Sequence, residues 1–475
     1  MDFWNRYVEM SHVLSRDEKN NLILQEGAHF VFGGDAVDQA PGDLEFLQEI
    51  VDFHHNYPGR VSIILGNRDI NKMRLAQELT AQHQKMHPWS TYRGVFWRGD
   101  AGLDHDEADT LPNRLRWILQ NTMGSGRSFE LRRQELGGDN VTDDMVVHSF
   151  HESLQPNGAM REYLKVGKLG VVLGDTLFVH GGLSKDVMGW IPQQQDEKKE
   201  NNARTWISKL NIFCKLQVEE FFRDMDDEKS HSNLTGNNWA MSGGYGTLFP
   251  GGDLMQYGMG WLPNLTRNNT VIYRDWFQLP TAAPPSSSAP PDVSRPTLPR
   301  PPESSVVEYL NSSKIKRVVC GHKPHGDACL IVKSQGDEVC VVTLDTSYSG
   351  QVQVVAAVEG DDQRSSNSGS DHSTNDNKRR GCAVSELLVY FEENESSRAV
   401  VHGIDSFGNE YVATPDDDSS LVGRISNVGG WIVKGERKKD QKLILGRLIG
   451  WNFENMYVDK QYFVEEMIGS RNAKL

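Results

Sequence analysis

The sequence predicts an α/β protein in which short buried strands alternate with helices. Four apolar runs each end at a polar residue beside glycine: residues 29–35, 61–67, 176–180 and 317–322. β-branched and aromatic residues dominate these runs, which is typical of strands buried on both faces of a sheet. A helix is predicted over residues 43–57, because Leu44, Leu47, Ile50 and Val51 share one face and Pro58-Gly59 ends it. The first two runs and this helix therefore form a strand–helix–strand unit.

The composition excludes several classes of protein. Hydrophobic residues make up 37% of the 475 residues, enough to bury a substantial core. A formal net charge of -15 argues against nucleic-acid binding, which needs an excess of Lys and Arg. The five cysteines lack paired spacing, which favours a reducing compartment. Because residues 1–14 do not resemble a secretion signal and no run reaches roughly 18 apolar residues, we expect a cytoplasmic protein without membrane contact.

The spacing of the four runs predicts where insertions lie. Only 32 residues separate Asp35 from Asn67, whereas 113 lie between Asn67 and His180 and 142 between His180 and His322. The two long gaps correspond to insertions that we expect to form a cap over the site, at residues 75–170 and 190–304. Helices are expected within them at residues 111–119 and 206–222.

The remaining segments differ in composition. Residues 280–302 are rich in Pro and Ser and predict an extended loop, and residues 360–380 are almost entirely polar and predict a disordered linker. Residues 383–475 alternate strand-like runs with turns and predict a β-rich C-terminal extension.

The four polar residues at the strand ends have the chemistry of metal ligands. The ligand site of an open α/β sheet lies beyond the carboxyl ends of its strands, which is where Asp35, Asn67, His180 and His322 are expected. A carboxylate can bridge two cations, an amide oxygen binds without adding charge, and imidazoles suit Mn²⁺, Fe²⁺ or Zn²⁺. His325 is a further possible ligand, or a residue that contacts substrate or solvent. Taken singly, such residues are as often turn or capping residues.

The motifs around these residues resemble those of the calcineurin-like metallophosphoesterases. The resemblance lies in GDAVD at 34–38, GNRD at 66–69, VHGGL at 179–183 and VCGHKPH at 319–325. The HGGLS form is most similar to the serine/threonine phosphoprotein phosphatase and diadenosine-tetraphosphatase branch. The resemblance implies a sandwich of two mixed β-sheets flanked by helices, over a metallophosphoesterase domain of residues 1–350.

The resemblance also implies a reaction. Asp35 would bridge two divalent metal ions, and Asn67, His180 and His322 would complete the second metal position. A metal-activated hydroxide would then attack phosphorus in line, so a metal-dependent hydrolase acting on a phosphate ester is expected. A phosphoprotein and a nucleotide or polyphosphate are both compatible with the sequence.

The chain departs from the family pattern in three places. No Asp-x-His-Gly motif precedes Asp35, and residues 2–14 resemble the helix that follows this motif in the family. The chain is therefore expected either to be N-terminally truncated or to bind a single ion. Arg68 replaces a His that protonates the leaving group, and Gln39 replaces a phosphate-binding Arg.

These departures lead to a hypothesis about Arg68. Its guanidinium cannot act as a general acid at neutral pH, but it can bind a phosphate with two hydrogen bonds. We therefore assign Arg68 to substrate binding and count Arg68, Asp69 and Asp38 as catalytic residues, with Asp38 or Asp69 holding the guanidinium. The alternatives are an ordinary Arg–Asp pair and, for the whole chain, a catalytically impaired module that binds phosphate or metal.

Overall fold

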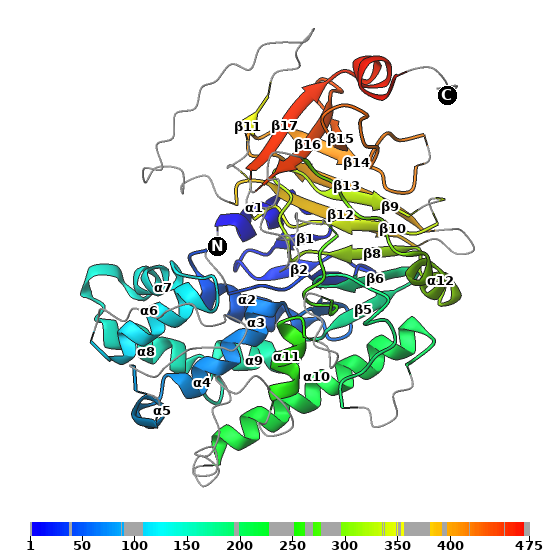
Figure 1. The fold of residues 1–475 in the computed structure, drawn as a ribbon. Helices are drawn as coiled ribbons and strands as arrows, with labels where there is room; N and C mark the ends of the chain where they lie inside the picture. Colours follow the sequence, from blue (N-terminus) through cyan, green and yellow to red (C-terminus); the bar gives the residue numbers. More distant parts are fainter. Residues whose placement is uncertain are drawn as a thin grey trace, which may run out of the picture. The chain divides into compact units, whose positions relative to one another are not determined.

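The computed structural model divides the chain into two compact units (Figure 1). The first comprises residues 13–172 and 178–274, and the second comprises residues 2–12, 173–177 and 275–475. The structure describes residues 2–37, 40–86, 88–89, 108–193, 199–227, 251–261, 269–276, 296–334, 336, 338–347, 349, 353–355, 381–391, 397–417, 419–450 and 452–469. The expected disordered linker at 360–380 and most of the expected loop at 280–302 lie outside these ranges.

The first unit contains the predicted strand–helix–strand unit. Strands β3 (Phe30–Phe32) and β4 (Val61–Ile63) pair in parallel, with Phe30 opposite Val61. Helix α2 (Asp43–Asn56) connects them and buries Leu47, Ile50 and Val51, as its helical spacing predicts. A short hairpin precedes this unit, formed by β1 (Leu14–Arg16) and β2 (Leu22–Leu24).

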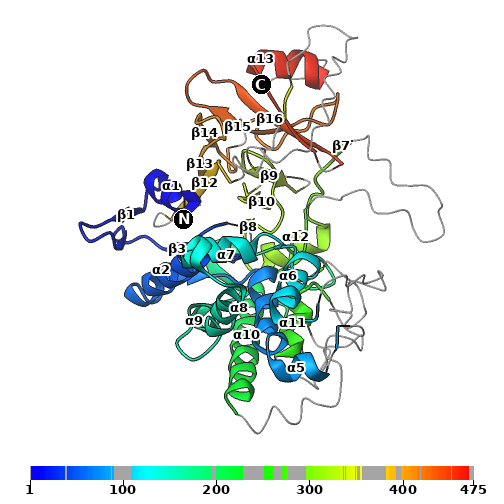
Figure 2. The same ribbon diagram turned by 90° about the vertical axis from the view of Figure 1, so that its left-hand side faces the viewer.

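The remaining elements of the first unit are mostly helices, and the two helices expected in the insertions are confirmed (Figure 2). They correspond to α6 (Leu111–Asn121) and α10 (Ala203–Asp226). Thr110 caps α6 by accepting the N–H of Asn113, and Asn202 caps α10. The other elements are α3 (Asn67–Asn71), η1 (Lys72–Arg74), α4 (Leu75–Glu78), α5 (Ala81–Met86), α7 (Ser128–Leu136), η3 (Gly138–Asn140), α8 (Asp143–Glu152), α9 (Ala159–Val166), β5 (Gly170–Leu173), β6 (Thr176–Val179) and α11 (Gly252–Gly258).

The second unit contains a mixed sheet in which the fourth predicted strand is confirmed as β8 (Arg317–Cys320). Strand β10 (Cys340–Thr343) pairs in parallel with β8 and antiparallel with β9 (Leu330–Lys333). The strand order continues from β8 to β6, whose first two residues are part of this unit. Helix α12 (Ser304–Ser312) leads into β8.

A larger sheet occupies the region that the sequence predicts to be β-rich. Its neighbouring strands from β12 to β17 pair antiparallel in chain order, and β7 and β11 join it at β16 and β17. Its core side chains include Val401, Tyr411 and Leu445, all fully buried. The elements are β7 (Pro296–Thr297), β11 (Gln353–Val354), β12 (Val384–Tyr390), β13 (Arg398–Ile404), β14 (Glu410–Ala413), β15 (Ile432–Arg437), β16 (Leu443–Ile449), β17 (Asn452–Val458), α13 (Lys460–Tyr462) and η6 (Phe463–Gly469).

The N-terminal helix α1 (Asp2–Met10) belongs to the second unit. Arg6 donates hydrogen bonds to the carbonyl oxygens of Gly381 and Cys382. The buried carboxylate of Glu386, on β12, accepts the backbone N–H of His12 at 3.0 Å and lies 2.9 Å from its Nδ1. These contacts attach the start of the chain to the C-terminal sheet.

The fold class is therefore α/β, with mixed sheets and helices. The calcineurin-like arrangement of two stacked sheets stays a prediction. Among the helices that the structure describes, none combines the length and the apolar composition required to cross a bilayer.

Candidate metal centre

The two loops that follow the parallel strands β3 and β4 lie against each other, with glycine at the points of closest approach. A Cβ atom at Gly66 would lie 2.0 Å from Oδ1 and 2.6 Å from the backbone N of Asp35. A Cβ atom at Gly34 would lie 2.6 Å from the backbone N of Gly66. Glycine is therefore required at both positions, and the close approach brings residues 35 and 67–69 together at the carboxyl ends of the strands.

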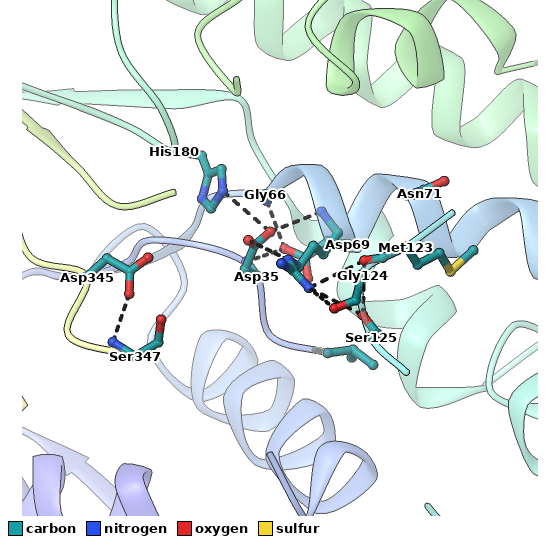
Figure 3. Close-up of polar contacts among 12 residues, drawn as sticks. Asp35, Gly66, Asp69, Asn71, Met123, Gly124, Ser125, His180, Asp345 and Ser347 are labelled. Atoms are coloured by element: carbon teal, nitrogen blue, oxygen red, sulfur yellow. Dashed lines mark hydrogen bonds and ion pairs between the residues drawn. The ribbon is translucent and has the colours of Figure 1, made fainter. Parts of the chain in front are cut away.

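The carboxylate of Asp69 joins these two loops. It accepts the backbone N–H groups of Asp35, Ala36 and Gly66, each at 2.8 Å, and Figure 3 shows it beside Asp35 and Gly66. The hydroxyl of Tyr163 also donates to it, at 3.1 Å. Asp69 and Tyr163 are both fully buried. Asp69 is also the third residue of α3, so its bond to Gly66 caps that helix.

Burial and the neighbouring charge of Asp35 raise the pKa of Asp69 to about 6, against the lowering effect of the backbone donors and His180. Its contacts give Asp69 a positioning task, because both carboxylate oxygens already accept hydrogen bonds from the loops. Its expected part in catalysis stays a prediction.

Asp35 presents its carboxylate to residues from two other segments. Its Oδ1 accepts the backbone N–H of Arg68 at 3.0 Å and lies 3.4 Å from Nε2 of His180 (Figure 3). Its Oδ2 lies 3.7 Å from Nε of Arg68. Asp35 adopts a left-handed backbone with φ 57°, a conformation that is costly for a residue other than glycine and that is frequent at functional sites.

His180 meets Asp35 with its Nε2 atom because its other ring nitrogen is engaged elsewhere. Nδ1 lies 2.7 Å from the carbonyl oxygen of Gly33, an acceptor, so Nδ1 carries a proton. In the neutral ring, Nε2 would direct a lone pair toward a carboxylate oxygen, which is unfavourable unless a proton or a cation lies between them. This donor arrangement fits a divalent metal ion, since metal-binding histidines commonly donate their second N–H to a carbonyl or carboxylate.

Without metal, the proton is retained at His180. Burial disfavours the charged ring, yet the Asp35 carboxylate, the bond to Gly33 and the charge of Asp69 raise the pKa of His180 to about 9. A metal ion that binds to Nε2 has to displace this proton.

Asn67 and Arg68 begin helix α3, directly after Gly66. Asn67 is buried, whereas the Arg68 side chain is 23% exposed. The guanidinium of Arg68 donates to the carbonyl oxygens of Met123 at 3.3 Å and Gly124 at 3.0 Å. These carbonyls and Asp35 hold Arg68 at the edge of the site. The sequence suggested Asp38 or Asp69 as the partner of the guanidinium. Asp38 and Gln39 lie outside the described residues.

The two other predicted ligands belong to the second unit. His322 follows β8 and, like Asp35, has a left-handed backbone, with φ 67°. His325 is buried, and its backbone N–H donates to Asp345 O at 3.2 Å. Burial and the charges of Lys434 and Lys323 hold the pKa of His325 well below its usual range. The same charges oppose a metal cation at its ring.

The sequence analysis did not select Tyr163 or the 123–125 loop. Tyr163 lies on α9, where Met160, Tyr163 and Leu164 share the spacing of any buried helical face. The loop acts through backbone carbonyl oxygens, which no residue type identifies. Both belong to the region 75–170, which was expected to form a cap.

Comparisons with known proteins give few relatives. No family model matches the chain, and no curated protein sequence matches it. One similar solved structure is a cold-active protein-tyrosine phosphatase of a psychrophile, Shewanella sp., with TM-score 0.34, 11% identity, and coverage of 96% of this chain and 76% of the other.

Two further structures of cold-active protein tyrosine phosphatase are similar to the same degree. One is a point mutant, with TM-score 0.34, 12% identity, and coverage of 87% of this chain and 76% of the other. The second has TM-score 0.33, 12% identity, and coverage of 84% and 71%. Likenesses this weak carry no argument about fold or activity.

Replacing Asp69 with Asn tests its role in joining the loops. The amide keeps one acceptor oxygen and places an NH₂ group against backbone N–H donors, so Asp69→Asn should lower the free energy of unfolding by about 2–4 kcal/mol. Urea denaturation of the metal-free protein measures the change. Asp52→Asn, an exposed position on α2, should change stability by less than about 0.5 kcal/mol. Equal stabilities for the two variants would contradict this role.

The raised pKa of His180 predicts a pH dependence of stability in protein treated with a chelator. A group whose pKa rises from 6.5 to about 9 on folding stabilises the native state fully below pH 6.5 and loses that contribution as the pH rises to 9. The loss should approach ~3 kcal/mol by urea denaturation. His180→Gln should remove this part of the pH dependence, and a wild-type stability that stays constant from pH 6.5 to 9 would refute the assignment.

Proposed function

We propose that this chain is a metal-dependent phosphoesterase related to the calcineurin-like metallophosphoesterases. The observation that carries the proposal is the 3.4 Å approach of His180 Nε2 to Asp35 Oδ1, while Nδ1 is bound to Gly33 O. A buried imidazole held in this way toward a carboxylate suits a shared cation. The four motifs that contain the strand-end residues supply the family relationship.

The proposed ligands are the residues that the four motifs supply, Asp35, Asn67, His180 and His322. His322 is included in this set because of its motif and because its backbone is left-handed, like that of Asp35. We leave His325 out of the set because Lys434 and Lys323 already place positive charge around its ring. A Mn²⁺, Fe²⁺ or Zn²⁺ ion held there would polarise the phosphoryl oxygens and activate water for hydrolysis.

Arg68 is the proposed phosphate-binding residue. Its guanidinium is partly exposed, and the carbonyl oxygens of Met123 and Gly124 fix its position beside Asp35. Because Arg68 cannot release a proton at neutral pH, it cannot protonate a departing alcohol. We therefore propose that, whether the substrate is a phosphoprotein, a nucleotide or a polyphosphate, the chain prefers phosphate esters with a good leaving group, such as aryl phosphates.

The charges around Asp35 favour one metal ion rather than the two expected from the family. Oδ1 faces His180, whereas Oδ2 faces the fixed positive charge of Arg68 at 3.7 Å. A second cation on the Oδ2 side would be repelled by the guanidinium. The position of Arg68 beside Oδ2 also favours the alternative function, a catalytically impaired module that binds metal or phosphate.

Metal binding and turnover distinguish the two functions. We expect the purified chain to bind one Mn²⁺ ion by calorimetry and to hydrolyse p-nitrophenyl phosphate only when Mn²⁺ is present. Asp35→Asn should abolish both properties, and Asp139→Asn, an exposed acid, should leave both intact. Mn²⁺ binding without turnover would establish the alternative module, and an absence of Mn²⁺ binding would overturn the proposal.

The role of Arg68 predicts a change in KM. Arg68→Ala removes charge-assisted hydrogen bonds to phosphate worth about 1.5–3 kcal/mol, so KM for p-nitrophenyl phosphate should rise roughly 10- to 150-fold. Arg68→His should not restore activity, because its ring lacks the two-pronged donor geometry. Arg127→Ala is the control, and unchanged kinetics in Arg68→Ala would exclude phosphate binding by Arg68.

A further inference from the structure

Two residues of the large C-terminal sheet and one of its turns hold the segment that follows His322. The ammonium group of Lys434, on β15, donates to the carbonyl oxygen of His325. The hydroxyl of Tyr411, on β14, accepts the backbone N–H of Cys329 at 3.1 Å. The hydroxyl of Ser406, in the turn between β13 and β14, donates to the Asp327 carboxylate. All of these residues lie in the second unit.

The sheet provides space for the Lys434 side chain. A Cβ atom at Gly446, on the neighbouring strand β16, would lie 2.4 Å from Cε of Lys434. A larger residue at position 446 would therefore require the Lys434 side chain to shift from its present course. Gly435 has a similar relationship to Tyr411, where a Cβ would lie 3.0 Å from Cδ2.

Burying the charged side chain of Lys434 costs free energy of desolvation. The residue is 4% exposed, and burial lowers its pKa to about 8, so it still carries its charge at pH 7. An apolar residue of similar size at this position would avoid the cost of desolvating a charge. A buried charge is usually less favourable for stability than such a replacement, so a role in positioning the neighbouring loop accounts for its presence.

We propose that the C-terminal sheet positions His322 as a metal ligand, with Lys434 as the principal positioning residue. Lys434 acts on the loop three residues beyond His322, through the carbonyl oxygen of His325, and Tyr411 and Ser406 fix the loop further along. This inference rests on the proposed metal-binding function of His322. It assigns residues 384–458 to the support of the site rather than to an independent binding module.

The experiment compares the full-length wild type with Lys434→Met, which keeps the length of the side chain and removes its donor. Two measurements are made: hydrogen exchange of the backbone amides of residues 321–329, and the dissociation constant of Mn²⁺ alone by calorimetry. Loss of a group that orients a metal ligand typically weakens metal binding 10- to 100-fold. We expect a weakening of about that size and at least ~10-fold faster exchange in the loop.

Two control variants separate positioning from general stability. Lys438→Met removes an exposed lysine that pairs with Glu410, and it should change neither measurement. Leu448→Ala removes a buried side chain of β16 outside the contacts with residues 325–329. It should lower the melting temperature and leave both Mn²⁺ affinity and loop exchange close to wild type. If Lys434→Met does not fold, Tyr411→Phe, which removes one acceptor, takes its place in the same two measurements. Its Mn²⁺ binding should be weaker than that of the wild type by about 3-fold or more.

Each outcome decides between the two proposals. If the wild type binds Mn²⁺ and the dissociation constant of Lys434→Met lies within about twofold of the wild-type value, the positioning role is wrong and the proposed function stands. Faster loop exchange with unchanged Mn²⁺ affinity also overturns positioning and leaves a structural contact only. If the wild type binds no Mn²⁺, the proposed function fails, and positioning of a metal ligand fails with it.

Discussion

The candidate site depends on a single buried carboxylate. Asp69 receives three backbone N–H groups from two loops that would otherwise face each other with unsatisfied donors. The glycines at 34 and 66 let these loops approach, and Asp69 supplies the attraction that keeps them together. The left-handed backbone of Asp35 is sustained by this contact, since its own N–H is one of the three groups that Asp69 binds.

Tyr163 connects this arrangement to a helix that the sequence assigned to a cap. Its hydroxyl completes the hydrogen bonding of Asp69, 94 residues away in sequence. Residues of the region 75–170 thus take part in the site: α9 supports Asp69 through Tyr163, and the loop after α6 holds Arg68 with carbonyl oxygens. The geometry around Asp35 is the joint product of the core strands and of the inserted helices.

The elements near the site could be predicted from sequence because their signals are local. Apolar runs that end at glycine identified β3, β4, β6 and β8, and helical spacing identified α2, α6 and α10. The pairing of Arg68 with Asp35 could not be predicted, because distance along the sequence does not show which of Asp35, Asp38 and Asp69 lies beside the guanidinium in space. The positions of Tyr163 and Lys434 were also hidden, since a buried Tyr on a helix and a Lys in a strand have no distinguishing pattern.

The assignment of α1 to the second unit has a consequence for the order of folding during synthesis. Helix α1 and His12 leave the ribosome before Glu386, which binds the backbone of His12 and follows it by 374 residues. At about 5–20 residues per second, roughly 20–75 s pass before this partner is made. Residues 13–172 and 178–274 can meanwhile fold as their own unit. Helix α1, a short amphipathic helix with Trp4 and Val8 on its buried face, is then still without its partner sheet. During that interval the nascent chain exposes apolar surface that a ribosome-associated chaperone would be suited to cover.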